Sequence, residues 1–239
     1  MKIVLLVVLI LLGLILLPFL FLFICGLFVD TRKQYERDSK FYRALLDGST
    51  TVILWCLGVR YEISGEEKFP ETGNFLFISN HRSNYDPIIQ WTVFKRYKLS
   101  FISKKENFKI PMYGRIIHRC CFMPIDRKSP RKAMETVNRA AKLLTETGNS
   151  VGVYPEGKRS KEGRLLPFHA GVLKVAQKAG KPIVVSTIEG TENIFRNIKR
   201  FRKTAVTIKI HAEKVRELKT SELSEYCEAL MKKELEEHI

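Results

Sequence analysis

The 239-residue sequence contains only five cysteines, and their spacing fits neither a metal site nor a local disulfide. No CxxC pair is present, no cysteine joins a histidine at zinc-site spacing, and the five histidines are scattered along the chain. Cys120 and Cys121 are neighbours, but on a strand their side chains would point to opposite faces. We therefore expect reduced thiols in a reducing compartment and no bound metal.

Several motifs that would identify other protein classes are also absent. No GxxxxGK[ST] spacing supplies a phosphate-binding loop, and no GxSxG element supplies a serine nucleophile. Neither an RNA-binding aromatic signature nor a helix-turn-helix pattern accompanies the basic residues. These absences argue against a P-loop NTPase, a serine hydrolase and a nucleic-acid-binding protein.

Acidic residues are in the minority. Forty-one Lys and Arg residues stand against 25 Asp and Glu residues, which gives a formal net charge of +16. Such a surplus favours polyanionic partners, among them phospholipid head groups, nucleic acid and phosphorylated substrates. Charge alone does not distinguish these partners.

Residues 3–29 contain no charged side chain and are almost wholly apolar. The stretch is long enough to cross a hydrocarbon layer of ~30 Å, although Gly13 and Pro18 leave open a dip into one leaflet. A signal peptide would have a shorter apolar core followed by small residues, whereas the first alanine is Ala44, so an uncleaved anchor is favoured. Only Lys2 precedes the stretch and five cations follow it by residue 43, which predicts a cytoplasmic location for the rest of the chain.

Strand-like and helical patterns alternate after this anchor. Residues 1–60 are expected to form the N-terminal membrane anchor and an amphipathic helical segment, whose apolar run at 51–59 fits either the membrane interface or the core. Residues 61–239 are expected to form one domain. Its predicted strands are 74–79, 98–103, 120–125, 150–155, 182–187 and 205–211, and its predicted helices are 87–94, 130–147, 170–180 and 220–238. This alternation predicts an α/β fold with a mixed, largely parallel sheet flanked by helices.

The stretch NHRSNYDP, residues 80–87, follows a predicted strand that ends near Ser79. Open α/β sheets bind ligands beyond such strand ends, so His81 and Asp86 are candidates for a general base and the carboxylate that orients it. On a continuous helix a five-residue offset would separate the two side chains by about 140°, so the loop has to fold back for them to meet. Asp86 before Pro87 is equally a good helix N-cap, and the stretch alone leaves both interpretations open.

A second polar stretch, YPEGKRS at residues 154–160, also follows a predicted strand. Gly157 permits a positive φ or a close backbone approach, and Arg159 offers a planar fork for phosphate oxygens. Glu156 and Ser160 complete the group. A solvated basic turn between a strand and a helix explains these residues equally well.

A third stretch, residues 103–128, is rich in cations. Its candidates for an anion-binding wall are Lys104, Lys105, Lys109, Arg115 and Arg127. Charge-rich segments are more often simply solvated, and that alternative stays open.

Taken together, these stretches resemble the 1-acyl-sn-glycerol-3-phosphate acyltransferase family, whose members are membrane-bound enzymes that make phosphatidic acid. The resemblance covers about residues 60–190, and its four blocks occur in the family's order. NHRSNYD is similar to the NHxxxxD block, KKENFKIPMYG with PIDR to the second, YPEGKRS to the FPEGTRS block, and GKPIVV to the fourth. Lys158 stands where threonine is common, and PIVVST lacks the second proline often found in the last block.

The resemblance implies acyl transfer from acyl-coenzyme A or acyl carrier protein to the sn-2 hydroxyl of lysophosphatidic acid. His81 would act as general base and Asp86 would orient it, without a metal or other cofactor. Lys105 would help to stabilise the oxyanion, and Arg159 with Gly157 would hold the acceptor's phosphate.

The remaining block residues receive supporting roles from the same resemblance. Glu156 would order the loop, Ser160 belongs to the substrate-binding set, and Arg127 is a weaker phosphate or carrier candidate. The membrane bilayer is the expected partner, and nucleic acid is not. Alternative acceptors are glycerol 3-phosphate or another lysophospholipid, and a membrane protein that binds anionic lipid without catalysis is a further alternative.

Overall fold

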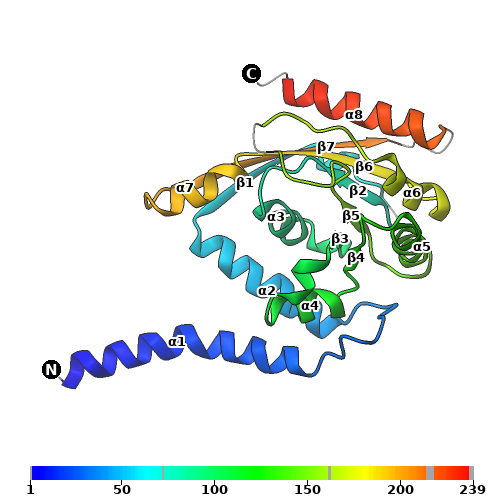
Figure 1. The fold of residues 1–239 in the computed structure, drawn as a ribbon. Coiled ribbons are helices and arrows are strands. Elements are labelled where there is room, and N and C mark those ends of the chain that lie inside the picture. Colours follow the sequence, from blue (N-terminus) through cyan, green and yellow to red (C-terminus); the bar gives the residue numbers. More distant parts are fainter. Residues whose placement is uncertain (1, 72, 161–162, 214–217, 237–239) are drawn as a thin grey trace.

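The computed structural model describes residues 2–71, 73–160, 163–213 and 218–236 of the chain (Figure 1). These residues form a seven-stranded sheet in the order β1-β7-β6-β2-β5-β3-β4. The strands are β1 (Val59–Ser64), β2 (Leu76–Ser79), β3 (Ser100–Lys104), β4 (Met123–Ile125), β5 (Val151–Val153), β6 (Ile183–Glu189) and β7 (Thr204–Glu213). Neighbouring strands are parallel except β6 and β7, which are antiparallel. The predicted mixed, largely parallel α/β fold is confirmed, although β1 was not predicted.

Helices cover both faces of this sheet (Figure 1). On one face pack α2 (Lys40–Cys56), α3 (Tyr85–Val93) and α4 (Tyr113–Arg119). On the other pack α5 (Pro130–Glu146), α6 (Lys174–Ala179) and α8 (Thr220–Glu236). The short α7 (Ile194–Ile198) connects β6 to β7. The result is a three-layer arrangement with an apolar core on each side of the sheet.

The strand β2 shows why the sequence specifies two cores. Phe75 and Phe77 point into the core beneath α2, α3 and α4, whereas Leu76 and Ile78 point into the core beneath α5, α6 and α8. All four side chains are completely buried. A central parallel strand is covered on both faces, so it reads as a continuous apolar run rather than an alternating one.

The helix predicted over residues 130–147 is confirmed as α5. Ser129 precedes it, and its hydroxyl accepts a hydrogen bond from the backbone N–H of Lys132 at 3.4 Å. Pro130 occupies the first turn, where its missing N–H costs nothing. Val137 and Leu144 lie on the buried face, as the apolar periodicity predicted.

The strand predicted over residues 120–125 is wrong in its first half. α4 ends at Arg119, the chain turns at Cys121 with φ +60°, and β4 begins only at Met123. Cys120 and Cys121 are both buried and neither forms a disulfide. Burial raises the pKa of the Cys121 thiol to about 11, so it stays protonated at neutral pH.

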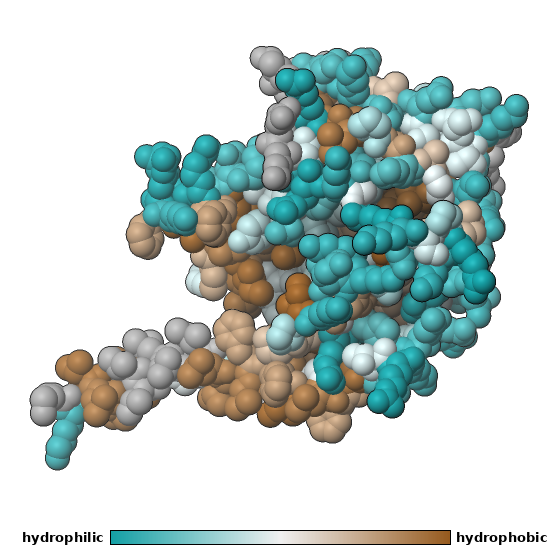
Figure 2. Space-filling view, viewed as in Figure 1, coloured by the Kyte–Doolittle hydropathy of each residue, from teal (hydrophilic) through white to brown (hydrophobic). Residues whose placement is uncertain are grey.

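The apolar leader forms α1 (Lys2–Leu27), one helix that continues through Pro18. Exposed apolar side chains, among them Ile3 and Leu17, cover much of its described surface (Figure 2). The predicted helical leader is confirmed as a helix. No helix in the described ranges is long and apolar enough to cross a membrane, so the predicted membrane span is not found there.

The helix α2 is tied to the sheet through a buried arginine. Arg43 is 6% exposed and pairs with Asp38 Oδ2 at 2.6 Å through its Nε. Its guanidinium also donates to the backbone carbonyls of Leu99 at 2.9 Å and Cys120 at 3.1 Å. α2 therefore packs as part of the same body as the sheet, while the predicted domain boundary near residue 60 stays a prediction.

Candidate active site

The loop after β2 brings His81 and Asp86 together. His81 Nδ1 lies 2.8 Å from Asp86 Oδ2, which confirms that the loop folds back, as contact between the two side chains required. The Asp86 side chain is completely buried, whereas 18% of the His81 side chain is exposed. Because Nδ1 faces the carboxylate, Nε2 is the ring nitrogen left to meet a substrate.

Asp86 accepts hydrogen bonds from other groups besides His81. Its Oδ2 also accepts the backbone N–H groups of Arg82 and Ser83, each at 2.7 Å. Of the two interpretations left open for Asp86, that of an N-cap is not found, because α3 begins at Tyr85, Asn84 is the N-cap, and Asp86 lies in the first turn. Asp86 therefore folds the preceding loop around itself and orients the imidazole at the same time.

The loop after β5 is bound directly to His81. Glu156 Oε1 accepts the backbone N–H of His81 at 2.6 Å, and the backbone N–H of Ser160 donates to the His81 carbonyl at 2.8 Å. Gly157 has φ +70°, and a Cβ placed there would lie 2.9 Å from the His169 ring. A side chain at this position would be both strained and crowded. The NHRSNYD and YPEGKRS stretches are thus one hydrogen-bonded unit.

Glu156 holds this unit from a buried position. It is 2% exposed, and its Oε2 accepts the backbone N–H of Leu166 at 2.9 Å. Burial raises the pKa of its carboxyl to about 7, and its two backbone hydrogen bonds only partly counteract that rise. Both carboxyl oxygens are occupied by backbone donors, as expected of a group that orders the loop.

An aromatic ring packs against one face of the His81 imidazole. Tyr154 stacks on His81 with ring centroids 4.2 Å apart and an interplanar angle of 17°. The Tyr154 hydroxyl donates to Gln90 Oε1 at 2.7 Å, and Gln90 Nε2 donates to Ser79 Oγ at 2.7 Å. This chain of hydrogen bonds joins β5, α3 and β2 behind the histidine and fixes its ring plane.

The comparison with protein-family models identifies the class to which this site belongs. The model described as "Acyltransferase" matches residues 60–189, which is more than half of the chain and includes both loops of the site. The chain belongs to the acyltransferase family. The His81–Asp86 pair and the glycine-containing loop are therefore parts of an acyltransferase domain.

Individual relatives of this acyltransferase carry a consistent description. It is 34% identical over 160 residues to a 1-acyl-sn-glycerol-3-phosphate acyltransferase from Cocos nucifera, covering 66% of this chain and 51% of that protein. It is 27% identical over 184 residues to the enzyme of that name from Salmonella typhimurium, covering 75% of this chain and 74% of that protein. The chain thus spans about half the length of some curated relatives that it matches.

A solved structure has the same fold. The 1-acyl-sn-glycerophosphate acyltransferase PlsC from Thermotoga maritima aligns with a TM-score of 0.66 at 25% identity. The alignment covers 91% of this chain and 86% of that chain. The similarity therefore extends beyond the residues matched by the family model.

The predicted cations of the acyltransferase lie at the same edge of the sheet as His81. Lys105 follows β3, and Arg127 and Arg159 follow β4 and β5, all parallel to β2. Lys105 Nζ pairs with Asp126 Oδ2 at 2.6 Å, and this hydrogen bond lowers the pKa of the Asp126 carboxyl. Arg127 and Arg159 are exposed. Within the described residues no hydrogen bond or ion pair joins these three cations to His81 or Asp86.

Thr191 is a site residue that the sequence analysis missed. It is completely buried just after β6, and its hydroxyl donates to Asp86 Oδ1 at 2.5 Å. Arg82 reinforces the contact between the two loops through Glu189 Oε1 at 3.2 Å and Glu192 Oε1 at 3.6 Å. Thr191 and Asp86 are 105 residues apart, and only the strand order brings them together.

We expect Thr191→Val to lower kcat by roughly 10-fold, because a buried carboxylate oxygen that loses its donor shifts or reorients, at a cost of about 1–3 kcal/mol. Thr191→Ser keeps the hydroxyl and should retain most of the kcat. Initial-rate measurements on both variants, with thermal melts to compare their folding, test the assignment. Equal losses in the two variants would mean that the methyl group matters and the hydrogen bond does not.

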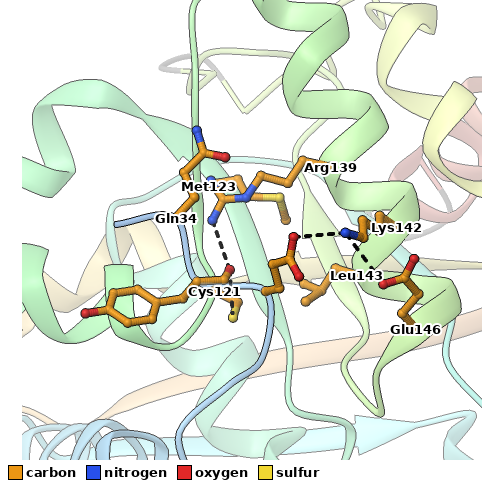
Figure 3. Close-up of a pocket in the computed structure, with 9 residues that line it drawn as sticks. Gln34, Cys121, Met123, Arg139, Lys142, Leu143 and Glu146 are labelled. Atoms are coloured by element: carbon orange, nitrogen blue, oxygen red, sulfur yellow. Dashed lines mark hydrogen bonds and ion pairs between the residues drawn. The ribbon is translucent and has the colours of Figure 1, made fainter. Parts of the chain in front are cut away.

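The small cavity in Figure 3 lies away from this site and has a volume of ≈ 50 Å³. None of the residues of the His81 site lines it. Around it the segment between α1 and α2 is fastened to α5: Arg139 donates to the Tyr35 carbonyl at 3.2 Å, and Lys142 pairs with Glu36 at 2.9 Å (Figure 3). The cavity therefore lies where the segment that follows α1 is attached to α5.

Proposed function

We propose that this acyltransferase transfers an acyl group from a thioester to the sn-2 hydroxyl of 1-acyl-sn-glycerol 3-phosphate and forms phosphatidic acid. The observation that carries the proposal is the 2.8 Å contact between His81 Nδ1 and the buried Asp86 carboxylate at the edge where ligands of α/β sheets bind. The descriptions of the relatives favour this acceptor.

In the proposed reaction, His81 Nε2 takes the proton of the acceptor hydroxyl as its oxygen attacks the thioester carbonyl. A C–O bond forms, and the tetrahedral intermediate then collapses with cleavage of the C–S bond. The imidazolium returns its proton to the departing thiolate. Asp86 stabilises the transient positive charge on the ring, and no acyl-enzyme forms.

The developing oxyanion needs donors, and we assign this role to Lys105 with nearby backbone amides. Lys105 is 50% exposed, so it can leave Asp126 for a substrate at little cost. Arg127 is a secondary candidate for the anionic donor, either acyl-coenzyme A or acyl carrier protein. The proposed chemistry uses no metal or other cofactor.

We assign the acceptor's phosphate to the loop of residues 157–160. Arg159 is exposed there, and Gly157 keeps the backbone open with its positive φ. Two hydrogen bonds to the backbone of His81, one accepted by the Glu156 carboxylate and one donated by the Ser160 N–H, support this assignment, since they set the distance between the loop and the base.

We expect Arg159→Ala to raise KM for the phosphorylated acceptor roughly 10- to 100-fold with a smaller change in kcat. A charged hydrogen bond of about 1.5–3 kcal/mol is lost from binding while the His81 pair is untouched. Acceptor titrations at saturating acyl thioester test this. The matched control is Arg37→Ala. Arg37 is an exposed arginine near the start of β3 and β5. An unchanged KM in Arg159→Ala would place the phosphate elsewhere.

We further propose that the acyltransferase works at the cytoplasmic face of a membrane, with α1 embedded among the acyl chains of that leaflet. The exposed apolar side chains of α1 support this, because contact with acyl chains would remove them from water. Cations at residues 32–43 favour the cytoplasmic leaflet. The acceptor is an amphiphile of that same layer.

The deciding experiment is an acylation assay with purified protein in detergent and in liposomes. Lysophosphatidate, glycerol 3-phosphate and a neutral lysophospholipid are each offered with acyl-coenzyme A and with acyl carrier protein. Phosphatidic acid from lysophosphatidate is the expected product. Acylation of glycerol 3-phosphate alone would reassign the acceptor, and no acylation with any pair would contradict the proposal.

A further inference from the structure

Aromatic and basic side chains are exposed together on a small surface beside α7. We call it the aromatic–basic edge; it consists of Trp55, Phe195, Phe201 and the four cations within residues 199–203. Trp55 is 80% exposed, Phe195 62% and Phe201 100%. Rings of this size are normally buried or placed against a partner, so their joint exposure indicates a contact surface.

Two distant segments build this surface. The backbone N–H of Thr204 donates to the Gly58 carbonyl at 3.1 Å, and a Cβ at Gly58 would lie 3.4 Å from the Lys203 side chain. The end of α2, which carries Trp55, therefore lies against the turn that carries Phe201. In Figure 1 the end of α2 and α7 both lie at the left-hand end of the sheet, and Figure 2 shows hydrophobic and hydrophilic residues adjoining there.

The turn holds Phe201 outward through a defined backbone. Phe201 has φ +51°, a conformation that a bulky side chain rarely adopts. Its N–H donates to the Ile198 carbonyl at 3.0 Å, and the N–H of Arg202 donates to the Asn197 carbonyl at 2.9 Å. Asn197 Nδ2 also donates to Thr204 Oγ1 at 3.1 Å. A strained residue held by this many hydrogen bonds indicates that the exposed ring has a function.

The cations of the aromatic–basic edge have no acidic partner among the described residues. In the part of the chain that the structure describes, no carboxylate pairs with Lys199, Arg200, Arg202 or Lys203. Lys199 Nζ instead lies 4.4 Å from the centroid of the Phe195 ring. The nearby Glu189 and Glu192 are paired with Arg82. Positive charge at this surface is therefore uncompensated and complements an anionic partner.

The aromatic–basic edge adjoins the catalytic edge of the sheet. Thr191, which donates to Asp86, comes four residues before Phe195 in the chain. β7 runs antiparallel to β6 with Glu189 opposite Thr207, so the turn before β7 lies where β6 ends. A partner at this surface would lie next to the opening of the His81 site.

We propose that the aromatic–basic edge docks on the head-group layer of an anionic lipid bilayer, with its three aromatic rings inserted and its cations on the phosphates. Aromatic rings with nearby cations favour the membrane interface. The apolar surface of α1 also favours a bilayer over a nucleic acid. The inference extends the proposed function, since it would place the site beside an acceptor held in the same bilayer.

Trp55 offers a direct probe, because Trp91, the second tryptophan of the chain, is 1% exposed. The full-length protein is mixed with phosphatidylcholine vesicles with and without phosphatidylglycerol, and with vesicles of brominated lipid. A Trp55→Phe variant supplies the Trp91 background. We expect a blue shift of Trp55 emission and quenching by brominated lipid that both increase with the anionic lipid.

We call the triple variant Arg200→Ser/Arg202→Ser/Lys203→Ser the edge variant. It should need a roughly 10- to 100-fold higher concentration of anionic lipid to reach half of the Trp55 response. The matched control Lys95→Ser/Arg96→Ser/Lys98→Ser removes the same charge from three exposed cations just before β3, outside residues 32–43, and should respond like the unaltered protein. Equal responses of the two triple variants, or equal responses with neutral and anionic vesicles, would overturn the proposal. A change of Trp55 emission on addition of a single-stranded oligonucleotide, with no change on addition of vesicles, would also overturn it.

An activity measurement separates this inference from the proposed function. On a short-chain acceptor that stays monomeric, the edge variant should keep its rate, because His81 and Asp86 are unchanged. On acceptor embedded in anionic vesicles its rate should fall at least tenfold. Inactivity of the unaltered protein on every acceptor would contradict the proposed function, while the Trp55 response would still decide the docking proposal. Equal rates of the edge variant and the unaltered protein on vesicles would overturn the docking proposal.

Discussion

His81→Ala should lower kcat for acyl transfer by about 1,000-fold or more, because the acceptor hydroxyl would then lose its proton to water alone. That factor corresponds to about 4 kcal/mol of transition-state stabilisation. The fold should survive, because Asp86 keeps three other hydrogen-bond donors, from Arg82, Ser83 and Thr191. Rates with purified variant and a thermal melt measure the two effects separately.

The control for this substitution is His118→Ala. His118 belongs to α4 and its Nε2 contacts the Lys33 carbonyl at 2.8 Å, so it also has a structural contact but none with the site. This variant should keep most of its activity. If His81→Ala retained a large share of the rate, the base would have to be another group.

Asp86→Asn should lower kcat by roughly 100-fold while leaving the melting temperature within a few degrees of the unaltered protein. An asparagine oxygen can still accept from His81, Arg82 and Ser83, and its amide can donate to Thr191 because a hydroxyl can also accept. The hydrogen-bond pattern is kept and only the negative charge is lost. The expected loss therefore measures how much that charge stabilises the imidazolium.

The control for Asp86→Asn is Asp38→Asn, which should lower the melting temperature and keep kcat. Asp38 is another poorly exposed carboxylate, with its side chain 9% exposed, and it pairs with Arg43 at the attachment of α2. Loss of this charge should lower the melting temperature, since a buried arginine would lose its partner, but kcat of the folded protein should be kept. Equal kcat losses in the two variants would show that Asp86 acts through folding alone.

The sequence predicted the parts of the site whose residues lie close to one another along the chain. His81 and Asp86 lie in one loop, and the offset between them predicted that the loop folds back. The strand before each polar stretch was predicted from its apolar run, which places the stretches at strand ends. The amphipathic period of α5 and its Ser129 and Pro130 start were equally local, so they were predicted with their correct faces.

The errors and omissions have physical reasons as well. Asp86 was a candidate N-cap because Pro87 suggested a helix start, whereas α3 already begins at Tyr85 with Asn84 as its N-cap. The turn at Cys121 has a left-handed backbone that no glycine or asparagine signals. Thr191 was missed because its contact depends on β6 lying next to β2, and the sequence does not specify strand order.

The peptide unit of His81 is held on both sides by the loop that follows β5: Glu156 accepts its N–H, and Ser160 donates to its carbonyl. That loop also carries Arg159, our candidate for the phosphate. Redesigning residues 154–160 for a new head group would therefore shift the imidazole at the same time. An engineer who wants a different acceptor should vary residues outside this loop, and should select for turnover rather than binding.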